Sequence, residues 1–383
     1  MGHKGYVTLD ETLAAELEDL TRLGLRRELL TLAAPGPVQE LAGHTVVSFA
    51  SNDYLGLGAE PLDLVAPVGA LASRLVVGNL SVHEELEQAL AGFVGAGAAL
   101  LFTSGFAANV GVIPALVGPG DIIFSDQLNH ASLIDGARLS GARIVVYPHN
   151  DVELLRIAME QERPGRARAL VLSEAVFSMD GDIADVVGLS ELCRAQDTWL
   201  YVDEAHSLGL LGENGAGLCA DKGVVPDVLL GTLGKSFATQ GAFVAGSTIL
   251  REWLIHRARS FVFSTGLSPY VSRATLERLV QVQKNDAGRE QALRLADHLR
   301  SSLRAKGLEV KGEGAAISSV VIGEAAAASN AAELLLEAGY LARAIRPPTV
   351  PKGTSRIRIV TSAAHSDAQV AGLIEALGAI LCS

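Results

Sequence analysis

Three short segments of the sequence place reactive side chains directly after apolar runs. Asp203 follows the run WLYV, and Lys235 lies in the small-residue loop that follows the next run, VLLGT. Upstream, ALLF leads into Ser104, Gly105 and Phe106 and then into a helix-like segment. An amine can bind an aldehyde as a Schiff base, a carboxylate can keep a pyridine nitrogen protonated, and a helix N-terminus binds phosphate. Pyridoxal 5'-phosphate (PLP) has all three groups, so the pattern predicts a PLP site anchored by Lys235.

Each of these features alone has a simpler explanation. A lysine in a Gly/Ser loop is usually a solvated surface residue, and an aspartate at a strand end often forms a turn or a helix cap. A Ser-Gly-Phe turn after a strand is also common. The three features favour a cofactor site because they occur together, each at the end of an apolar run. The alternative is an α/β domain in which these residues are structural.

Apolar runs of strand length alternate with helix-like stretches from about residue 98. The runs are AALLF, DIIFS, ARIVVYP, ARALVLS, TWLYVDE, DVLLGT and AFVAGS. Continuous apolar strands separated by helices predict an α/β fold with a mostly parallel sheet that is buried on both faces. In such sheets ligands bind at the carboxyl ends of the strands. The reactive residues follow these predicted ends.

The flanking segments have different patterns. Leucines at helical spacing predict an amphipathic helix over residues 9–32. After about residue 268, a long helical stretch leads into an α+β pattern that includes ISSVVIG and RIRIVTS. We therefore predict an N-terminal helix and arm over residues 1–48, a large PLP-binding domain over 49–275 and a small α+β C-terminal domain over 276–383.

Composition excludes several classes of partner. The net charge of −12 argues against a nucleic-acid partner, because nucleic-acid binding needs basic surface. The three cysteines, Cys193, Cys219 and Cys382, lack metal-ligand spacing and predict neither a metal site nor a disulfide framework. They suit a reducing compartment. The sequence has no signal-like N-terminus and no uninterrupted apolar run of membrane-spanning length, so we expect a cytoplasmic protein without a membrane partner.

The chain also resembles a known family in eight stretches that follow one another in order. They are SNDYLGL (51–57), SRLVVGNLSVHEELE (73–87), LFTSGFAANVGV (101–112), DQLNHASLIDGARLS (126–140), SEAVFSMDGDIAD (173–185), VDEAHSLGLLGENGAG (202–217), GTLGKSFATQGAF (231–243) and SRIRIVTSAAH (355–365). On these stretches the sequence resembles the α-oxoamine synthases, which are fold-type I PLP-dependent transferases with an aspartate-aminotransferase-like fold. The resemblance implies PLP as the cofactor and a homodimer with the active site at its interface.

The resemblance implies roles for individual residues of the cofactor site. Lys235 would form the Schiff base, His130 would stack on the pyridine ring, and Asp203 would pair with the ring nitrogen. His206 would reach the ring hydroxyl and assist catalysis. The other implied cofactor contacts are Ser178, the amides of Gly105 and Phe106, Thr232, and Thr265, whose segment FVFSTGLSP would reach the phosphate site of a partner subunit.

Substrate-binding residues are implied in the same way. Arg358 would receive the substrate carboxylate through a bidentate contact, and Arg356, on the same face of the strand, is the alternative. Asn52 would lie at the site entrance. Thr349 follows two prolines, which make a rigid segment that could shape an acyl-chain channel. Arg26 is a candidate for the far carboxylate of the acyl chain or the phosphates of its carrier, with a helix-surface charge as the alternative.

The segment AIRPPTVPKGTSRIRI resembles the branch of the family that makes 8-amino-7-oxononanoate in biotin biosynthesis. This resemblance implies that L-alanine condenses with pimeloyl-CoA or a pimeloyl carrier protein and that CO₂ and the free thiol carrier are released. The first alternative is a sister synthase that uses glycine or serine with another acyl-CoA. The second alternative is a non-catalytic subunit with the same fold. The link over residues 58–72 is shorter than is usual in the family, and it lies where relatives have the site entrance and the subunit interface.

Overall fold

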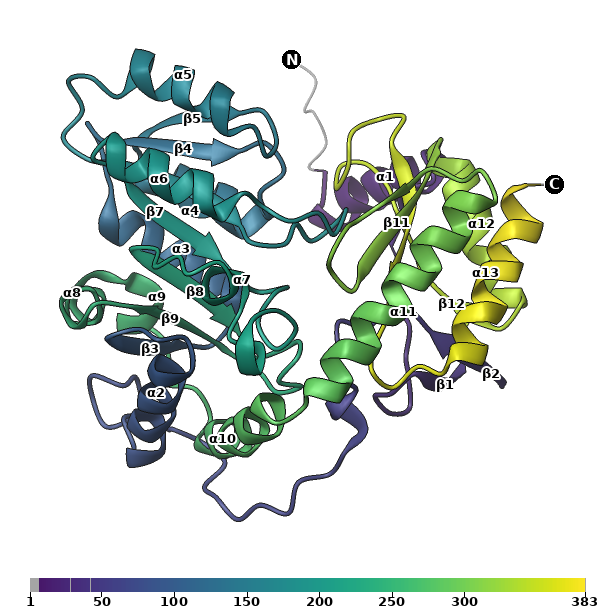
Figure 1. The fold of residues 1–383 in the computed structure, drawn as a ribbon, viewed down its shortest axis with the longest axis horizontal. Helices are drawn as coiled ribbons and strands as arrows, with labels where there is room; N and C mark the ends of the chain where they lie inside the picture. Colours follow the sequence, from purple (N-terminus) through teal and green to yellow (C-terminus); the bar gives the residue numbers. More distant parts are fainter. Residues whose placement is uncertain (1–6, 28, 42, 383) are drawn as a thin grey trace.

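A seven-stranded sheet forms the centre of the larger part of the molecule (Figure 1). The computed structural model describes residues 7–27, 29–41 and 43–382. In spatial order the strands are β3 (Ala98–Phe102), β9 (Ala242–Gly246), β8 (Val228–Thr232), β7 (Trp199–Asp203), β6 (Ala169–Glu174), β4 (Ile122–Asp126) and β5 (Arg143–Tyr147). Only β9 runs antiparallel to its neighbours. All seven predicted apolar runs are strands of this sheet, so the predicted α/β class is confirmed.

Helices cover both faces of this sheet. They are α2 (Ser81–Phe93), α3 (Gly105–Leu116), α4 (Ala131–Ser140), α5 (Val152–Glu162), α6 (Val186–Ala195), α7 (Leu218–Asp221), α8 (Thr248–Arg257), α9 (Arg259–Val262) and α10 (Pro269–Gln283), with short 3₁₀ turns η1 (Leu57–Ala59) and η2 (Glu213–Gly215). Successive strand residues enter two separate apolar clusters. Leu200 and Val202 face one cluster, and Tyr201 between them faces the other. This alternation explains why the strands read as continuous apolar runs.

The smaller part is built on an antiparallel sheet in the order β10 (Val310–Lys311), β11 (Ile317–Gly323), β14 (Ser355–Val360) and β13 (Arg343–Ile345). Its apolar core joins this sheet to α11 (Asp286–Ala305), α12 (Ala325–Glu337) and α13 (Asp367–Leu381). The helical stretch expected after residue 268 is two helices, because α10 ends at Gln283 and Asn285 caps α11 by accepting a hydrogen bond from the Gly288 amide (3.0 Å). The predicted domain boundary at residue 275 falls inside α10, which packs against α2.

The N-terminal segment lies with the smaller part (Figure 1). The hairpin β1 (Val38–Leu41) and β2 (His44–Ser48) joins it there, because β2 pairs in parallel with β12 (Tyr340–Leu341). Helix α1 (Leu9–Arg22) precedes the hairpin. The helix predicted over residues 9–32 is therefore too long. It ends where Gly24 adopts a left-handed conformation (φ +66°) and the Leu25 amide bonds back to the Leu20 carbonyl (2.8 Å), a glycine stop.

The carboxyl ends of β6, β7 and β8 and the loops that follow them face the smaller part (Figure 1). Within the described part of the chain, none of the helices has both the length and the apolar character that a bilayer crossing requires.

Candidate active site

Asp203 is a buried carboxylate held from two sides at the carboxyl end of β7. Its side chain is 5% exposed. The Asn109 side chain of α3 donates to Oδ2 (3.0 Å), and the Ala205 amide donates to Oδ1 (3.0 Å). Asn109 is itself fixed, because it accepts from the Tyr201 hydroxyl (2.6 Å) and donates to Ser132 Oγ (2.8 Å). Asp203 therefore presents a negative charge in a fixed orientation.

Lys235 lies beside His206, with 2.7 Å between Nζ and Nε2. The loops after β7 and β8 can meet this closely because residue 209 is a glycine. Gly209 has φ +83°, and a Cβ there would lie 2.3 Å from the Cβ of Ser236. Ser236 Oγ also donates to the Leu208 carbonyl (2.6 Å), which ties the two loops together. The close packing of Ser236, the neighbour of Lys235, against Gly209 therefore allows the short distance between Lys235 and His206.

The surroundings of Lys235 depress its basicity. Burial lowers the pKa of its amine to about 8, and the positive charge of Arg358 acts in the same direction. The carboxylates Asp203 and Glu174 oppose this shift. An amine with a pKa near neutrality is partly unprotonated under physiological conditions, so Lys235 can act as a nucleophile or as a base.

His206 is a neutral, buried imidazole that joins Lys235 to Tyr54. Burial, followed by the charges of Lys235 and Arg358, holds its pKa well below the ordinary value. The Tyr54 hydroxyl lies 2.5 Å from Nδ1, and burial raises the pKa of that hydroxyl. Tyr54 was not predicted as a site residue, although it lies within the segment SNDYLGL. Its aromatic ring beside Leu55 has the pattern of a core residue.

His130 begins α4 and belongs to the same cluster. Its Nδ1 lies 2.8 Å from Ser132 Oγ, which connects it through Asn109 to Asp203. Burial lowers the pKa of His130, while the charge of Asp203 raises it and that of Lys235 lowers it. The structure therefore brings together the four predicted catalytic residues, Lys235, His206, Asp203 and His130.

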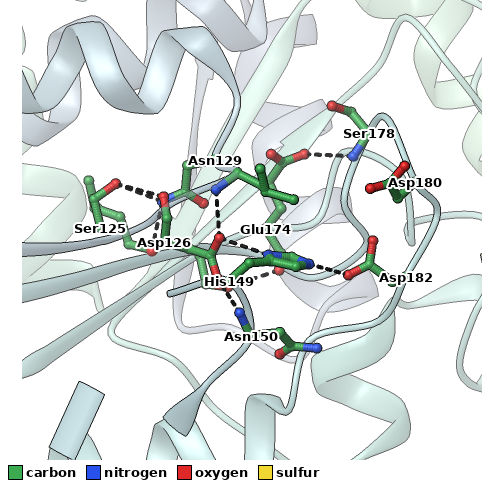
Figure 2. A network of polar contacts seen from close by, with 12 residues as sticks. Ser125, Asp126, Asn129, His149, Asn150, Glu174, Ser178, Asp180 and Asp182 are labelled. Carbon is green, nitrogen blue, oxygen red and sulfur yellow. Dashed lines mark hydrogen bonds and ion pairs between the residues drawn. The ribbon is translucent and has the colours of Figure 1, made fainter. Parts of the chain in front are cut away.

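Glu174 is a further carboxylate of this cluster, and the sequence pattern did not predict it. It ends β6 directly beside Asp203 in the strand register, and it is 3% exposed. Its Oε2 accepts from the Ser178 amide (3.2 Å), a contact drawn in Figure 2, whereas its Oε1 is buried without a hydrogen-bond partner among the described residues. Burial raises the pKa of Glu174 to about 8, Asp203 adds to this shift, and Lys235 opposes it. Its position is the signal that could have identified it, because Glu174 is the last residue of β6 just as Asp203 is the last residue of β7.

Glu174→Gln is expected to make folding stability less sensitive to rising pH. Because the pKa of Glu174 is raised from 4.5 to about 8, its contribution is fully present below about pH 4.5 and is lost as the pH rises through 8. Between these values the free energy of unfolding falls by about 1.4 kcal/mol per pH unit. In urea unfolding, the wild type should lose about 2 kcal/mol more than the variant between pH 6 and pH 8.

The matched control for this measurement is Glu191→Gln, at an exposed position of α6. Its free energy of unfolding should decrease with rising pH as that of the wild type does. Parallel curves for the wild type and Glu174→Gln would mean that Glu174 is already ionised at pH 6.

The predicted phosphate-binding residues lie at the ends of β3 and β8. Helix α3 begins at Gly105 as predicted, and Ser104, which was not predicted to act, caps it by accepting from the Ala107 amide (3.1 Å). A Cβ at Gly105 would lie 3.9 Å from the Leu230 side chain, so this helix start lies over β8. Thr232 ends β8 and donates to the Gly241 carbonyl (3.3 Å). The Phe106 side chain is half exposed.

Arg358 reaches this cluster from β14 in the smaller part. Its Nε donates to the Ser178 carbonyl (2.7 Å), and its Nη2 donates to Asn52 Oδ1 (3.0 Å). Arg356, on the same strand face, instead forms an ion pair with Asp180. No carboxylate of the described residues lies within ion-pair distance of Arg358. Of the two candidates, Arg358 therefore has the positive charge that is available for a substrate carboxylate.

Three predicted site residues lie away from the Lys235 cluster. Thr349 is exposed on the rim of a cavity of about 610 Å³, which is also lined by Leu128, Phe177 and Met179. Arg26 is exposed after α1, with its guanidinium 3.4 Å from Thr21 Oγ1, and no contact joins it to the cluster. Thr265 is also exposed, in a β-bridge with Ser73. No hydrogen bond among the described residues joins the Thr265 side chain to the Lys235 cluster.

The chain is similar to known proteins over most of its length. The model of the family "Aminotransferase class I and II" matches residues 44–377. The 8-amino-7-oxononanoate synthase of Herminiimonas arsenicoxydans is 45% identical over 385 residues, which cover 96% of this chain and 99% of that protein.

Two solved structures extend the comparison to the fold. Serine palmitoyltransferase from S. paucimobilis, with a bound PLP–myriocin aldimine, has a TM-score of 0.90 at 29% identity, with 97% of each chain covered. The 8-amino-7-oxononanoate synthase of Francisella tularensis has a TM-score of 0.74 at 26% identity, with 87% of this chain and 97% of that chain covered. From these matches and the site geometry, we conclude that the protein belongs to the aminotransferase class I and II family, within its α-oxoamine synthases, and has the fold of the fold-type I PLP-dependent transferases.

Proposed function

We propose that the protein binds PLP at Lys235 and condenses L-alanine with a pimeloyl thioester. The products are 8-amino-7-oxononanoate, CO₂ and the free thiol carrier, as in biotin biosynthesis. One observation carries the proposal: the low-pKa amine of Lys235 lies in one cluster with the held carboxylate of Asp203 and the unneutralised Arg358. The relatives named 8-amino-7-oxononanoate synthase support the choice of reaction.

The residues present fit PLP at each of its reactive groups. Lys235 supplies the amine for the aldehyde, Asp203 supplies a fixed negative charge for the ring nitrogen, and His130 supplies a planar ring at the start of α4. The start of α3 and Thr232 supply hydrogen-bond donors for the phosphate. When bound, PLP provides an electron sink that stabilises negative charge on the Cα of an amino acid.

The chain's own groups then have separable tasks. Arg358 and Asn52 bind the alanine carboxylate, because the guanidinium fork matches a carboxylate bidentately. Lys235, as a neutral amine, takes the proton from Cα. His206, held by Tyr54, stays neutral and serves as a hydrogen-bonding group beside Lys235. Burial of these groups strengthens each electrostatic interaction, since little water screens them.

The acyl thioester would enter through the cavity of about 610 Å³ between the two parts of the molecule. Its walls combine apolar side chains, among them Leu128, Ile134 and Met179, with Lys352 and with Lys311, which pairs with Asp180 at 3.6 Å. Such a lining suits an alkyl chain that ends in an anionic group. Either coenzyme A or a carrier protein could deliver the chain, and Thr349 lies at the rim.

We further propose a cytoplasmic homodimer. The segment between η1 and α2 contains no helix and exposes a run of apolar side chains: Val65, Val68, Leu71, Val76 and Val77. Exposed apolar patches of this kind usually contact another chain. The same segment pairs with Thr265 through Ser73, so a partner copy that covers it would also meet the predicted phosphate contact. The free cysteines suit a reducing compartment.

The proposal predicts that L-alanine perturbs the visible absorbance of the PLP-loaded protein at a concentration at least about tenfold lower than glycine or L-serine does. One methylene or one hydroxyl is worth about that much in a fitted pocket. Adding pimeloyl-CoA with alanine should then release CO₂ and free thiol in equal amounts. Preference for glycine or serine, with no thiol released from pimeloyl-CoA, would assign the site to a sister synthase that uses another acyl-CoA.

A further inference from the structure

His149 lies between two carboxylates outside the Lys235 cluster (Figure 2). Its Nδ1 is 2.9 Å from Asp126 Oδ1, and its Nε2 is 2.5 Å from Asp182 Oδ2. The ring of Phe177 packs edge-on against the imidazole, with the centroids 4.4 Å apart at 87°. Both ring nitrogens thus face acceptors that are anionic when ionised, an arrangement that a protonated imidazole satisfies completely.

The electrostatics favour that protonated form. Burial opposes the charge on His149, but the hydrogen bonds and charges of Asp126 and Asp182 outweigh it and raise the pKa to about 10. Asn150, which donates its amide to Asp126 Oδ2 (2.7 Å), is neutral. Asp126 and Asp182 are therefore the charged groups that face the ring, and His149 keeps its proton through neutral pH.

Asp126 connects His149 to the turn that carries His130. Asp126 ends β4, and its Oδ1 also accepts from the Leu128 amide (2.8 Å). The next residue, Asn129, donates to the Leu172 carbonyl of β6 (2.8 Å), and His130 follows at the start of α4. The contact between His149 and Asp126 therefore holds one end of the turn that presents the predicted ring-stacking histidine.

Asp182 connects His149 to a second functional segment, the loop of residues 175–183 after β6. The Asp182 carbonyl accepts from the Phe177 amide (3.0 Å), so the loop folds back on itself. Its far side meets the smaller part of the molecule. There Ser319 Oγ donates to the Met179 carbonyl (2.6 Å), and Arg358 Nε donates to the Ser178 carbonyl (2.7 Å).

We propose that His149 is a positioning residue whose charged ring couples the His130 turn to the 175–183 loop. Because Arg358 donates a hydrogen bond to the Ser178 carbonyl of that loop, this coupling fixes the position at which the guanidinium would bind the amino-acid carboxylate. This inference rests on the proposed function only for the identity of that amino acid. His149 therefore affects the affinity for the amino acid, whereas the position of Lys235, the proposed base, does not depend on it.

The kinetic test uses PLP-loaded full-length protein with His149→Gln, Asp182→Asn and the double variant. His149→Gln should raise the KM for L-alanine roughly tenfold, as small displacements of a binding group do, with kcat within about twofold of the wild type. Asp182→Asn should raise the KM less at pH 7, because its amide oxygen can still accept from the protonated ring. The KM of the double variant for L-alanine should be no higher than the higher of the two single-variant values, since both changes act on the same link. His256→Gln, at an exposed position of α8, is the matched control and should leave KM unchanged.

The pH dependence gives a signature that a merely structural role would not produce. Asp182 raises the pKa of His149, so Asp182→Asn lowers that pKa and lets His149 lose its proton at a lower pH. The KM for alanine of this variant should rise between pH 7 and pH 9 more steeply than that of the wild type or of the double variant. Additive effects of the two single changes, or identical pH profiles, would overturn the proposal.

Amide hydrogen exchange separates this inference from the proposed function, because it needs no substrate. His149→Gln should speed exchange at residues 176–182 of the full chain, whereas His256→Gln should not. Unchanged exchange would overturn the coupling. If the protein does not accept alanine, the wild type itself will show no alanine-dependent signal. Faster exchange in His149→Gln would still support the link between the turn and the loop.

Discussion

Lys235→Ala is expected to abolish turnover, with a loss of more than about three orders of magnitude, and to remove the visible absorbance of covalently bound PLP. The structure provides the reason. Lys235 is the buried amine whose pKa falls to about 8, and its Nζ lies 2.7 Å from the neutral His206. The variant removes both the covalent anchor and the proposed base. An absorbance spectrum, followed by a thiol-release assay with alanine and pimeloyl-CoA, measures the two losses separately.

Two further variants make the lysine result specific. Lys235→Arg keeps a positive charge at the site but cannot lose its proton, so it should be as inactive as the alanine variant. Lys222→Ala changes an exposed lysine that pairs with Asp221, and it should leave both spectrum and turnover unchanged. Turnover that survives in Lys235→Ala would refute the assignment of the base and anchor.

Asp203→Asn is expected to retain bound PLP while slowing the exchange of the alanine α-proton by about a thousandfold or more. A single orienting carboxylate can be worth that much when a neighbouring ring must stay protonated. The two donors that hold Asp203, Asn109 Nδ2 and the Ala205 amide, suit a carboxylate with two accepting oxygens. An asparagine offers one acceptor and no charge. Proton NMR of L-alanine in D₂O measures the exchange directly.

The same substitution has an electrostatic signature within the cluster. Asp203 raises the pKa of Glu174, so its neutralisation should lower that pKa and let Glu174 ionise at lower pH. Asp221→Asn, at an exposed position of α7, is the control for a generic loss of negative charge. Normal α-proton exchange in Asp203→Asn would show that the ring nitrogen does not depend on this carboxylate.

Local sequence patterns predicted those elements whose formation depends mainly on neighbouring residues. Apolar runs of strand length predict buried strands whatever surrounds them, and all seven are present. The start of α3 at Gly105 also follows from nearby residues, because Ser104 caps it. The predicted length of α1 was wrong because helical spacing was followed past Gly24, whose left-handed backbone ends the helix.

Long-range contacts account for what the patterns did not reveal. Tyr54 follows the polar residues Asn52 and Asp53, and Glu174 follows an apolar run, so neither pattern reveals a site residue. The assembled fold places Tyr54 2.5 Å from His206 and Glu174 beside Asp203. Arg356 and Arg358 share one face of a strand, so their spacing alone does not separate them, although motif position favours Arg358. The structure pairs Arg356 with Asp180 and leaves Arg358 to neutral partners.

The sequence by itself determined the fold class and the identity of the reactive groups, because strand burial and the chemistry of an amine or a carboxylate depend on residue type and immediate neighbours. Tertiary structure decided the pKa of each group and its partners. Those properties depend on which distant segments burial brings together and on how far water is excluded from them. His149 illustrates the difference: the sequence shows an ordinary histidine, whereas the fold places it between Asp126 and Asp182 and keeps it charged.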